Sequence, residues 1–561
     1  MTNNRIPTIE SPTATQWLAR LDNPDQALHA IYGNDPDILY ARVDLLRAVV
    51  KTFLLRFGDC PLRLFRSPGR INLRGMHVDT HGGYLNLMTH QREVVLAVSP
   101  SGGPTSICVN INPMRDEVAF DAHAADVPNP RRDWLGFIND PALQAAPHPP
   151  RGHWGRYMEG CALRVRHAFP EAQLRGLSMA VGGDIPEGAA LSSSAALCVA
   201  GVSAVLACNG LALDPAALIL AARDAEWYAG SRCGVSDQAA MVLGGPGQVV
   251  NVALLATQLD VSGMQRISLP DDVRILVANS HTKRSLSGAE MLDYTRNRFA
   301  YSLALEVLRS ELPPSVAQSL DRLSKFSPET LPEWRDPRNI YRLIEGIPEE
   351  IDIDSLRDNY DLQNLGAVYE QYFGSLPPEQ RPTHFHLRGP LLFGLAESER
   401  ARIFAHLLEG GDFERAGRLM SIGHDGDRRL TPGGAPYRFP VDDTALRAYA
   451  AESRPLADCP GVYGASSPVL DTLVDTALDA GALGACLTGA GIAGTVLALC
   501  RTADAPAVAN RLRQRLSAPG YPHLAHLKSP LTPAQLDSSI VINQATAAAG
   551  ELPSTATSYL P

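Results

Sequence analysis

Apolar residues alternate with small or polar residues over positions 177–183, and the chain changes character abruptly at Pro186. Alternation with a period of two predicts a β-strand, and the long run of Ala, Val and Leu farther on is typical of a buried helix. Between the two elements, Pro186 and Gly188 end the strand. Three serines at positions 192–194 stand where the helix must begin. The pattern therefore predicts a strand, a short loop of small residues and a helix with a serine-rich start.

This strand, loop and helix together predict a cradle for phosphate groups. The first amides of a helix have no partner within the helix, and the positive end of its dipole favours anions. Small side chains in the loop let a ligand approach the backbone closely. An ordinary serine-rich helix cap that binds no ligand has the same local pattern. Other motifs in the chain are therefore needed to distinguish a helix cap from a phosphate cradle. The residues expected to form the cradle are Pro186, Gly188, Ala189, Ala190, Leu191, Ser192, Ser193 and Ser194.

The same periodicities predict both helices and strands along most of the chain, which indicates an α+β protein. The expected helices are 37–57, 157–169 and one that starts at Pro215, and the expected strands are 62–66, 93–98, 274–280 and 495–500. Residues 110–155, rich in Pro, Asp and His, are expected to form surface loops. Residues 544–561, rich in Ala, Ser, Thr and Pro, are expected to form a disordered tail.

The composition is that of a globular protein without a nucleic-acid partner. The chain has 561 residues, 45% hydrophobic and 20% charged, which is enough for two or more domains with sizeable cores. A net charge of −10 argues against nucleic acid, which usually needs a basic face. The nine cysteines lack the paired spacing of a zinc site or a disulfide framework.

No segment predicts secretion or membrane insertion. The N-terminus lacks the apolar core of a signal peptide. Residues 189–213 carry no charge and have the length of a membrane span, but four serines, Asn209 and two glycines interrupt them. A buried helix explains this segment better, so we expect a cytoplasmic protein with no membrane partner.

Two further motifs lie far from the serine loop in the sequence. Residues 67–83 alternate polar and apolar positions after a Pro-Gly break, which would place Arg70, Asn72 and also Arg74 on one face of a strand. Residues 487–494 form a glycine-rich loop before a predicted strand. A glycine-rich loop is a weak signal by itself, because many turns have this composition.

In this order, the three motifs resemble the signature motifs of the GHMP small-molecule kinases, and most closely those of the galactokinase branch. The similarity covers roughly residues 60–300 and 385–545. It implies an α+β fold with a ribosomal-protein-S5-domain-2-like N-terminal domain, a ferredoxin-like C-terminal domain and an active site in the cleft between them. The expected parts are a helical N-terminal extension (1–60), an ATP-binding domain (61–270) and a C-terminal domain (271–543) with a helical insertion at about 311–384.

The resemblance also implies roles for two carboxylates downstream of the serine loop. A Gly-Val-Ser-Asp-Gln segment resembles the part of galactokinases that carries the base, so Asp237 would orient or deprotonate the sugar hydroxyl. Arg70 would stand beside it and offset charge that develops during transfer. Glu226 would hold a magnesium ion together with the hydroxyl of Ser194, or alternatively of Ser193, and the phosphates of ATP. Without the resemblance, both carboxylates would be read as solvated acids at helix ends.

The first motif departs from galactokinases at two positions of the expected sugar site. In those enzymes a Glu, a His and an Asp hold sugar hydroxyls, and the matching residues here are Met76, His77 and Asp79. A thioether is at best a weak acceptor, so a C6 hydroxyl buried against Met76 would lose its partner at a cost of roughly 1–3 kcal/mol. Arg74 replaces an apolar residue, and it would hold the carboxylate of a uronic acid if it pointed into the cleft.

Other expected site residues come from later parts of the chain. An ungapped match to galactokinases puts Met291 where those enzymes have a tyrosine that packs on the sugar, whereas an insertion of three residues puts Tyr294 there. Tyr294 is favoured because an Arg-rich helix follows it. Gly489 and Gly491 are expected to pack near the phosphate cradle. The whole expected sugar site is Arg74, Met76, His77, Asp79, Gly234 and Tyr294.

The sequence therefore predicts an ATP- and Mg²⁺-dependent kinase that phosphorylates the anomeric C1 hydroxyl of a galactose-like monosaccharide. The departures at positions 74 and 76 favour a sugar altered at C6, namely L-arabinose, fucose or galacturonate. Galactokinase proper is an alternative. His77 and Asp79 argue against a kinase of another alcohol such as mevalonate or homoserine, and Asp237 with the intact serines argues against a non-catalytic sensor of sugar and ATP. The sequence leaves open whether the protein is a monomer or a dimer.

Overall fold

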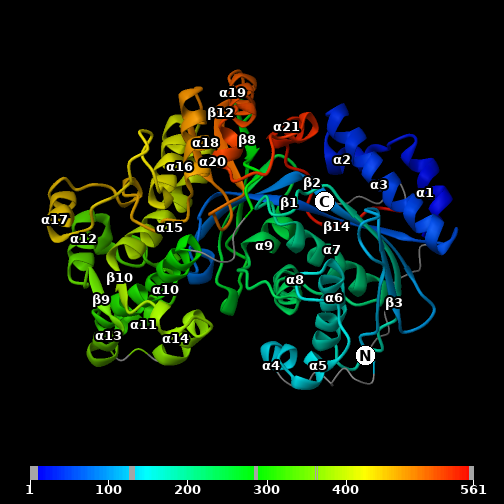
Figure 1. The fold of residues 1–561 in the computed structure, drawn as a ribbon, viewed down its shortest axis with the longest axis horizontal. Helices are drawn as coiled ribbons and strands as arrows, with labels where there is room; N and C mark the ends of the chain where they lie inside the picture. Colours follow the sequence, from blue (N-terminus) through cyan, green and yellow to red (C-terminus); the bar gives the residue numbers. More distant parts are fainter. Residues whose placement is uncertain (1–10, 125–132, 284–288, 361, 363, 555–561) are drawn as a thin grey trace.

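The protein folds into two mixed α/β domains, which lie side by side in Figure 1. The structure, a computed structural model, describes residues 11–124, 133–283, 289–360, 362 and 364–554. The N-terminal domain lies on the right of Figure 1, and the C-terminal domain with its insertion on the left. In the described part of the chain, no helix combines the length and the apolar character that a bilayer crossing needs.

One large sheet organises the N-terminal domain. Its strands follow the order β14-β1-β2-β5-β3-β4, and β6 and β7 continue from β2. Neighbouring strands are antiparallel except for β3 and β5, which are parallel. The strands are β1 (Arg63–Arg74), β2 (Tyr84–Pro100), β3 (Ser106–Asn110), β4 (Val118–Phe120), β5 (Leu177–Gly183), β6 (Gln248–Ala253), β7 (Gln265–Ser268) and β14 (Gly550–Glu551).

Helices cover both faces of this sheet. Along β2, Val95 and Ala97 belong to the hydrophobic cluster built with α3, whereas Leu96 and Val98 belong to the cluster that contains α7. Successive side chains of a strand point to opposite faces, so both layers bury apolar residues and β2 becomes continuously apolar here. The helices of this domain are α3 (Pro36–Phe57), α4 (Trp134–Ile138), α5 (Pro141–Ala145), α6 (Trp154–Ala168), α7 (Ser193–Cys208), α8 (Pro215–Ala229) and α9 (Ser236–Leu243).

Two short helices, α1 (Ala14–Leu21) and α2 (Gln26–Tyr32), precede α3 and are tied to the sheet. The Tyr32 hydroxyl donates to Oε1 of Glu93 at 2.8 Å, and the other oxygen of this buried carboxylate accepts from Arg66. In α3, Arg42 pairs with Asp184, which lies between β5 and the serine loop. The N-terminal helices are therefore bonded to β2 and to the residue that follows β5, at the start of the serine loop.

The C-terminal domain is built on a four-stranded antiparallel sheet of order β11-β12-β8-β13. Its strands are β8 (Val273–Asn279), β11 (Gly484–Leu487), β12 (Thr495–Arg501) and β13 (Ile540–Ile542). The remaining helices of the domain are α15 (Arg388–Glu409), α16 (Phe413–Asp427), α17 (Asp443–Ala451), α18 (Pro468–Asp479), α19 (Ala505–Ser517), α20 (Tyr521–Leu524) and α21 (Pro533–Ser539).

The segment between β8 and α15 is mostly helical and packs against the C-terminal domain. Its long helix α10 contacts α15, and a two-stranded ribbon of β9 and β10 joins the shorter helices. Its elements are α10 (Ala289–Ser310), α11 (Pro314–Ser319), α12 (Pro337–Glu345), β9 (Glu350–Asp352), α13 (Ile353–Asn359), α14 (Leu365–Phe373) and β10 (His384–His386).

Two expectations about irregular segments are wrong. Residues 544–554 are not a disordered tail: Ala545, Ala547 and Leu552 are buried, and β14 pairs with β1. Small apolar side chains fit under the sheet edge, although their composition is also typical of disorder. Likewise, residues 110–155 contain β4, α4 and α5, and Phe137 and Leu143 are buried, so this segment is not merely a set of surface loops.

Candidate active site between the two domains

The serine loop runs from β5 to α7 and has an unusual backbone. Gly188, Ala190 and Ser192 all have left-handed φ angles, of 75°, 57° and 63°. Ser192 is the N-cap of α7, but its side chain makes no cap hydrogen bond. The Ser192 side chain therefore leaves the backbone amides in the first turn of α7 available to an anion. The side chains of Ala189 and Leu191 are buried and anchor the loop from below.

The Ser192 hydroxyl instead donates to Oδ2 of Asp237, in the first turn of α9. The other oxygen, Oδ1, accepts from Arg70 Nε at 2.7 Å. Arg70 is nearly buried, and a second guanidinium nitrogen bonds the Ala190 carbonyl of the serine loop. Strand β1, the serine loop and α9 therefore bring Arg70, Ser192 and Asp237 into one bonded group.

Glu226 lies next to this group, at the buried side of α8. It accepts hydrogen bonds from Gln238 and the Cys233 thiol, and the nearby Ser194 hydroxyl favours its charged form. Burial and the nearby Asp237 carboxylate raise the pKa of Glu226 to about 7. A divalent cation would offset both effects, and a carboxylate with a hydroxyl is the hard-oxygen donor set that Mg²⁺ prefers. Among the described residues, no group of three or more His, Cys, Asp or Glu side chains could hold a metal by itself.

Asp79 and Gly234 meet close to the same carboxylate group. Asp79 Oδ2 accepts from the Ser236 amide at 3.4 Å, immediately before Asp237 in the chain. A Cβ atom added to Gly234 would lie 2.1 Å from Asp79 Oδ2, so any side chain here would displace the Asp79 carboxylate. The structure thus places Asp79 beside the start of α9.

His77 lies in an aromatic cluster. Its ring stacks on Tyr463 with centroids 4.2 Å apart and an interplanar angle of 14°, and its Nε2 is 3.5 Å from Asp427 Oδ1. Tyr294, on α10, contacts both His77 and Tyr463, with centroid distances of 6.1 and 5.9 Å. Met291 lies one turn earlier on the same helix. The residues that sequence reasoning missed here are Tyr463 and Asp427, because neither lies near the first motif in the chain.

Arg74 does not face the site, and the expectation that it contacts the sugar is wrong. Its side chain is fully buried, 2.8 Å from Glu397, and it also donates to the carbonyls of Leu419 and Met420 at 3.2 and 2.7 Å. The alternation that predicted its direction is broken by a register shift between Asn72 and Arg74. Such a bulge re-aims the next side chain. No part of this guanidinium is accessible to a sugar carboxylate.

Met76 is also withdrawn from the surface. Only 1% of its area is exposed, and it belongs to a hydrophobic cluster with Ile71 and Leu73. Met76 therefore fills the core beneath the first motif and offers no exposed side chain to a sugar. The expectation that a substrate packs on this thioether is not met by the geometry.

The glycine-rich loop packs on the serine loop through Gly489, as expected, and through Gly494 in place of the expected Gly491. A Cβ atom at Gly489 would lie 3.1 Å from the Ala190 side chain, and one at Gly494 only 2.7 Å from it. Gly491 instead faces the carbonyl of Ala465, where a Cβ atom would come within 2.2 Å. Gly489 and Gly494, both with left-handed φ angles, therefore permit the close contact between the two loops.

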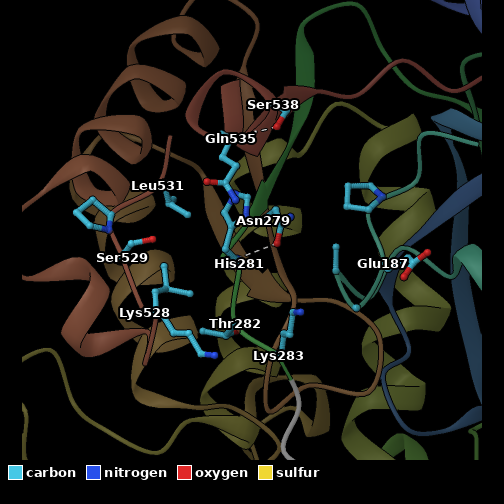
Figure 2. Close-up of a pocket in the computed structure, with 15 residues that line it drawn as sticks. Glu187, Asn279, His281, Thr282, Lys283, Lys528, Ser529, Leu531, Gln535 and Ser538 are labelled. Atoms are coloured by element: carbon cyan, nitrogen blue, oxygen red, sulfur yellow. Dashed lines mark hydrogen bonds between the residues drawn. The ribbon is translucent and has the colours of Figure 1, made fainter. Parts of the chain in front are cut away.

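A cavity of about 290 Å³ opens between the start of the serine loop and the C-terminal domain. Figure 2 shows Glu187 on one wall and Lys528, Ser529 and Leu531 on the other, with Lys283 between them. Lys283 and Lys528 are both exposed, and their positive charge faces the same space as the phosphate cradle. Sequence reasoning missed both lysines, because they are far apart in the chain and share no motif.

Comparison with known proteins agrees with this geometry. The GHMP kinases N terminal domain matches residues 156–245, the GHMP kinases C terminal domain matches residues 442–518, and the galactokinase galactose-binding signature matches residues 51–100. The galactokinase of Chloroflexus aggregans is 28% identical over 458 residues, which cover 81% of this chain and 88% of that protein. The galactokinase of Bos taurus is 25% identical over 475 residues, covering 84% and 92%.

Among solved structures, the galactokinase of Lactococcus lactis in complex with galactose shares the fold. It superposes with a TM-score of 0.60 at 19% identity, over 90% of this chain and 99% of the other. The chain thus carries the N- and C-terminal domains of the GHMP kinases together with the galactokinase galactose-binding signature, and it has the two-domain fold of this family. Within that family it is a galactokinase-like, ATP-dependent sugar kinase.

Proposed function

We propose that this enzyme transfers the γ-phosphoryl group of ATP to the anomeric C1 hydroxyl of a galactose-like monosaccharide. The O–H bond of the sugar and the bond from the γ-phosphorus to its bridging oxygen break, and a sugar 1-phosphate and ADP form. The observation that carries the proposal is the bonded group of Arg70, Ser192 and Asp237 at the start of α7. It puts a carboxylate and a cation directly beside a phosphate cradle.

Each residue of this group has a task that suits phosphoryl transfer. Asp237 would accept the proton of the C1 hydroxyl, and Arg70 would offset the negative charge that develops on the transferred group. The serine loop would hold the phosphates through its amides. Positioning and charge stabilisation account for most catalysis of this reaction, because little covalent chemistry is required of the protein.

Ser194 and Glu226 are the residues that would hold a magnesium ion. When bound, Mg²⁺ neutralises phosphate charge and bridges the nucleotide to the protein. The Ser194 hydroxyl is near enough to Glu226 to lower the pKa of its carboxyl, which supports a ligand shared by the two side chains.

The sugar side of the site would be formed by Asp79, His77 and Tyr294. Asp79 lies beside α9 and can accept hydrogen bonds from hydroxyls, whereas His77 and Tyr294 belong to an aromatic cluster that can pack on the apolar face of a sugar. Tyr294 is preferred over Met291 for this task because its ring contacts His77.

At C6, the enzyme is proposed to favour sugars that lack a hydroxyl. Because Met76 is buried in the core and Arg74 is held by Glu397, neither side chain contacts the sugar, and the support for galacturonate is lost. The preference for L-arabinose or fucose rests only on the absence of a Glu acceptor at position 76. A comparison of kcat/KM for D-galactose, D-fucose and L-arabinose tests this point. An advantage of about tenfold or more for D-galactose, roughly 1.4 kcal/mol in transition-state binding, would contradict it and would make the enzyme a galactokinase proper.

The reaction itself is tested with free sugars, ATP and magnesium, with ³¹P NMR to locate the new phosphate. We expect a phosphate on C1 of at least one galactose-like sugar. Turnover only at another hydroxyl, or none with any sugar of the panel, would overturn the proposed reaction.

A further inference from the structure

Glu397, on α15, is bonded to the backbone of the expected sugar-binding motif. Its Oε1 accepts from the Gly75 amide at 2.7 Å and from the Met76 amide at 3.1 Å. Arg74 Nε donates to the same oxygen at 3.0 Å. Its second oxygen, Oε2, accepts from Arg400 Nε at 2.7 Å. One carboxylate therefore holds three consecutive residues at the end of β1.

The bonded segment leads directly to the side chains proposed to meet the sugar. It joins β1 to the short 3₁₀ helix that begins at Asp79. Gly75 has a φ of 97° and His77 a φ of 62°, the latter a conformation that L side chains rarely adopt. A non-glycine residue stays in this region only when its surroundings determine it. The two amide bonds to Glu397 come immediately before His77 and supply such a constraint.

The carboxylate that makes these bonds is fully buried and charged. Burial alone would raise the pKa of Glu397, but the Arg74 and Arg400 guanidiniums hold it below its usual range. Bonds from amides to a charged acceptor are stronger than those to a neutral one. Arg74, which replaces an apolar residue of galactokinases, thus stabilises the charge of the residue that holds its own loop.

We propose that Glu397 is a positioning residue for sugar binding, which fixes the backbone of residues 75–79 so that His77 and Asp79 present their side chains to the substrate. Because α15 belongs to the C-terminal domain and β1 to the N-terminal domain, the sugar loop is held from across the domain boundary. The sugar part of this inference rests on the proposed function, whereas the attachment of the loop can be measured without a substrate.

The experiment compares full-length Glu397→Gln with Glu399→Gln as its matched control. Glu399 lies two residues further along α15 and pairs with Arg402 at 2.7 Å, away from the loop. We expect Glu397→Gln to raise the sugar KM by about tenfold or more while the ATP KM changes by less than about twofold. The reason is that the loose segment 75–79 carries side chains proposed to contact the sugar and none proposed to contact ATP. In the ligand-free protein, hydrogen exchange in a peptide covering residues 71–83 should be faster. Glu399→Gln should change neither quantity.

A second pair of variants covers the case in which the single variant does not fold. Arg74→Met/Glu397→Met removes the carboxylate together with one of its two buried guanidinium partners, and Arg400 keeps its bonds to the carbonyls of Ala457 and Cys459. Arg74→Met alone keeps Glu397 on both amides. The double variant should show the raised sugar KM and the fast exchange in full, and Arg74→Met, which keeps both amide bonds to Glu397, should show clearly less of either. A double variant with normal exchange, or with fast exchange but an unchanged sugar KM, would overturn the inference. If the wild type phosphorylates no sugar, the proposed function fails, and the exchange measurement still decides whether Glu397 holds the loop.

Discussion

Arg70 donates to Asp237 across 2.7 Å, although the two residues are 167 positions apart in the chain. Arg70 lies on β1 and Asp237 in the first turn of α9, and the Ser192 hydroxyl reaches the second oxygen of the same carboxylate. The pair therefore depends on how the sheet, the serine loop and α9 pack together. Its position beside the loop is the basis of the first prediction.

Asp237→Asn should abolish most of the turnover and leave ATP binding intact. Asparagine keeps the shape and the contacts with Arg70, but it cannot accept a proton at the reacting hydroxyl. We expect kcat to fall by well over about tenfold, which corresponds to more than about 1.4 kcal/mol. Asp260→Asn, at an exposed position, is the control. A variant that keeps more than about a tenth of the wild-type turnover would show that Asp237 is not the base.

Ser194→Ala and Glu226→Gln should each raise the magnesium concentration needed for half-maximal activity and lower turnover. Both side chains are proposed to meet one ion, and each replacement removes a hard oxygen ligand or its charge. A magnesium titration of the initial rate measures the effect, with Ser203→Ala, farther along α7, as the control. Identical titration curves for both variants and the wild type would remove the metal assignment.

Stability should fall on acidification because His90 is buried in its neutral form. Burial, with smaller contributions from Arg92 and Arg42 and against the effect of Asp184, lowers the pKa of His90 to about 3. In the unfolded chain histidine titrates near 6.5. Between those values only the unfolded state takes up the proton, so stability is lost as pH falls through this window, by up to about 1.4 kcal/mol per pH unit, and is unaffected above it.

The variant His90→Gln isolates this contribution, because glutamine does not titrate. Its Tm should fall less between pH 7 and pH 5 than that of the wild type. His406→Gln, at a position where about half of the side chain is exposed, should retain the wild-type pH dependence. Equal losses of Tm in His90→Gln and the wild type would exclude His90 as the cause.

Truncation after Asn543 should destabilise the protein relative to truncation after Ser554. The longer deletion removes β14 and the buried residues Ala545, Ala547 and Leu552. It also removes the carbonyls of Ala547 and Ala548 that accept from buried Arg66, which leaves donors without partners. We expect Tm to fall by about 5 °C or more. A scan in which the two truncated proteins melt together would contradict the structural role of this segment.

The sequence by itself determined the elements that depend on local periodicity and on Pro and Gly. The alternation at 177–183 coincides with β5, the serines at 192–194 stand at the start of α7, and the helix expected at 157–169 is α6, from Trp154 to Ala168. Strand and helix patterns are properties of neighbouring residues, so they can be recognised without the fold. The order of the three motifs also sufficed for the family.

Only the tertiary structure decided where individual side chains point and which distant residues meet. Alternation put Arg74 on the face of Arg70, but the register shift after Asn72 turned it into the interior, towards Glu397. A bulge depends on strand pairing, which no local pattern encodes. For the same reason Gly494, rather than Gly491, lies against Ala190, and residues 544–554 are ordered by the edge of β1 that they cover. The burial of a side chain and its hydrogen-bond and ion-pair partners are properties of the packed chain. Where the backbone departs from a regular helix or strand, they determine the direction in which the side chain points.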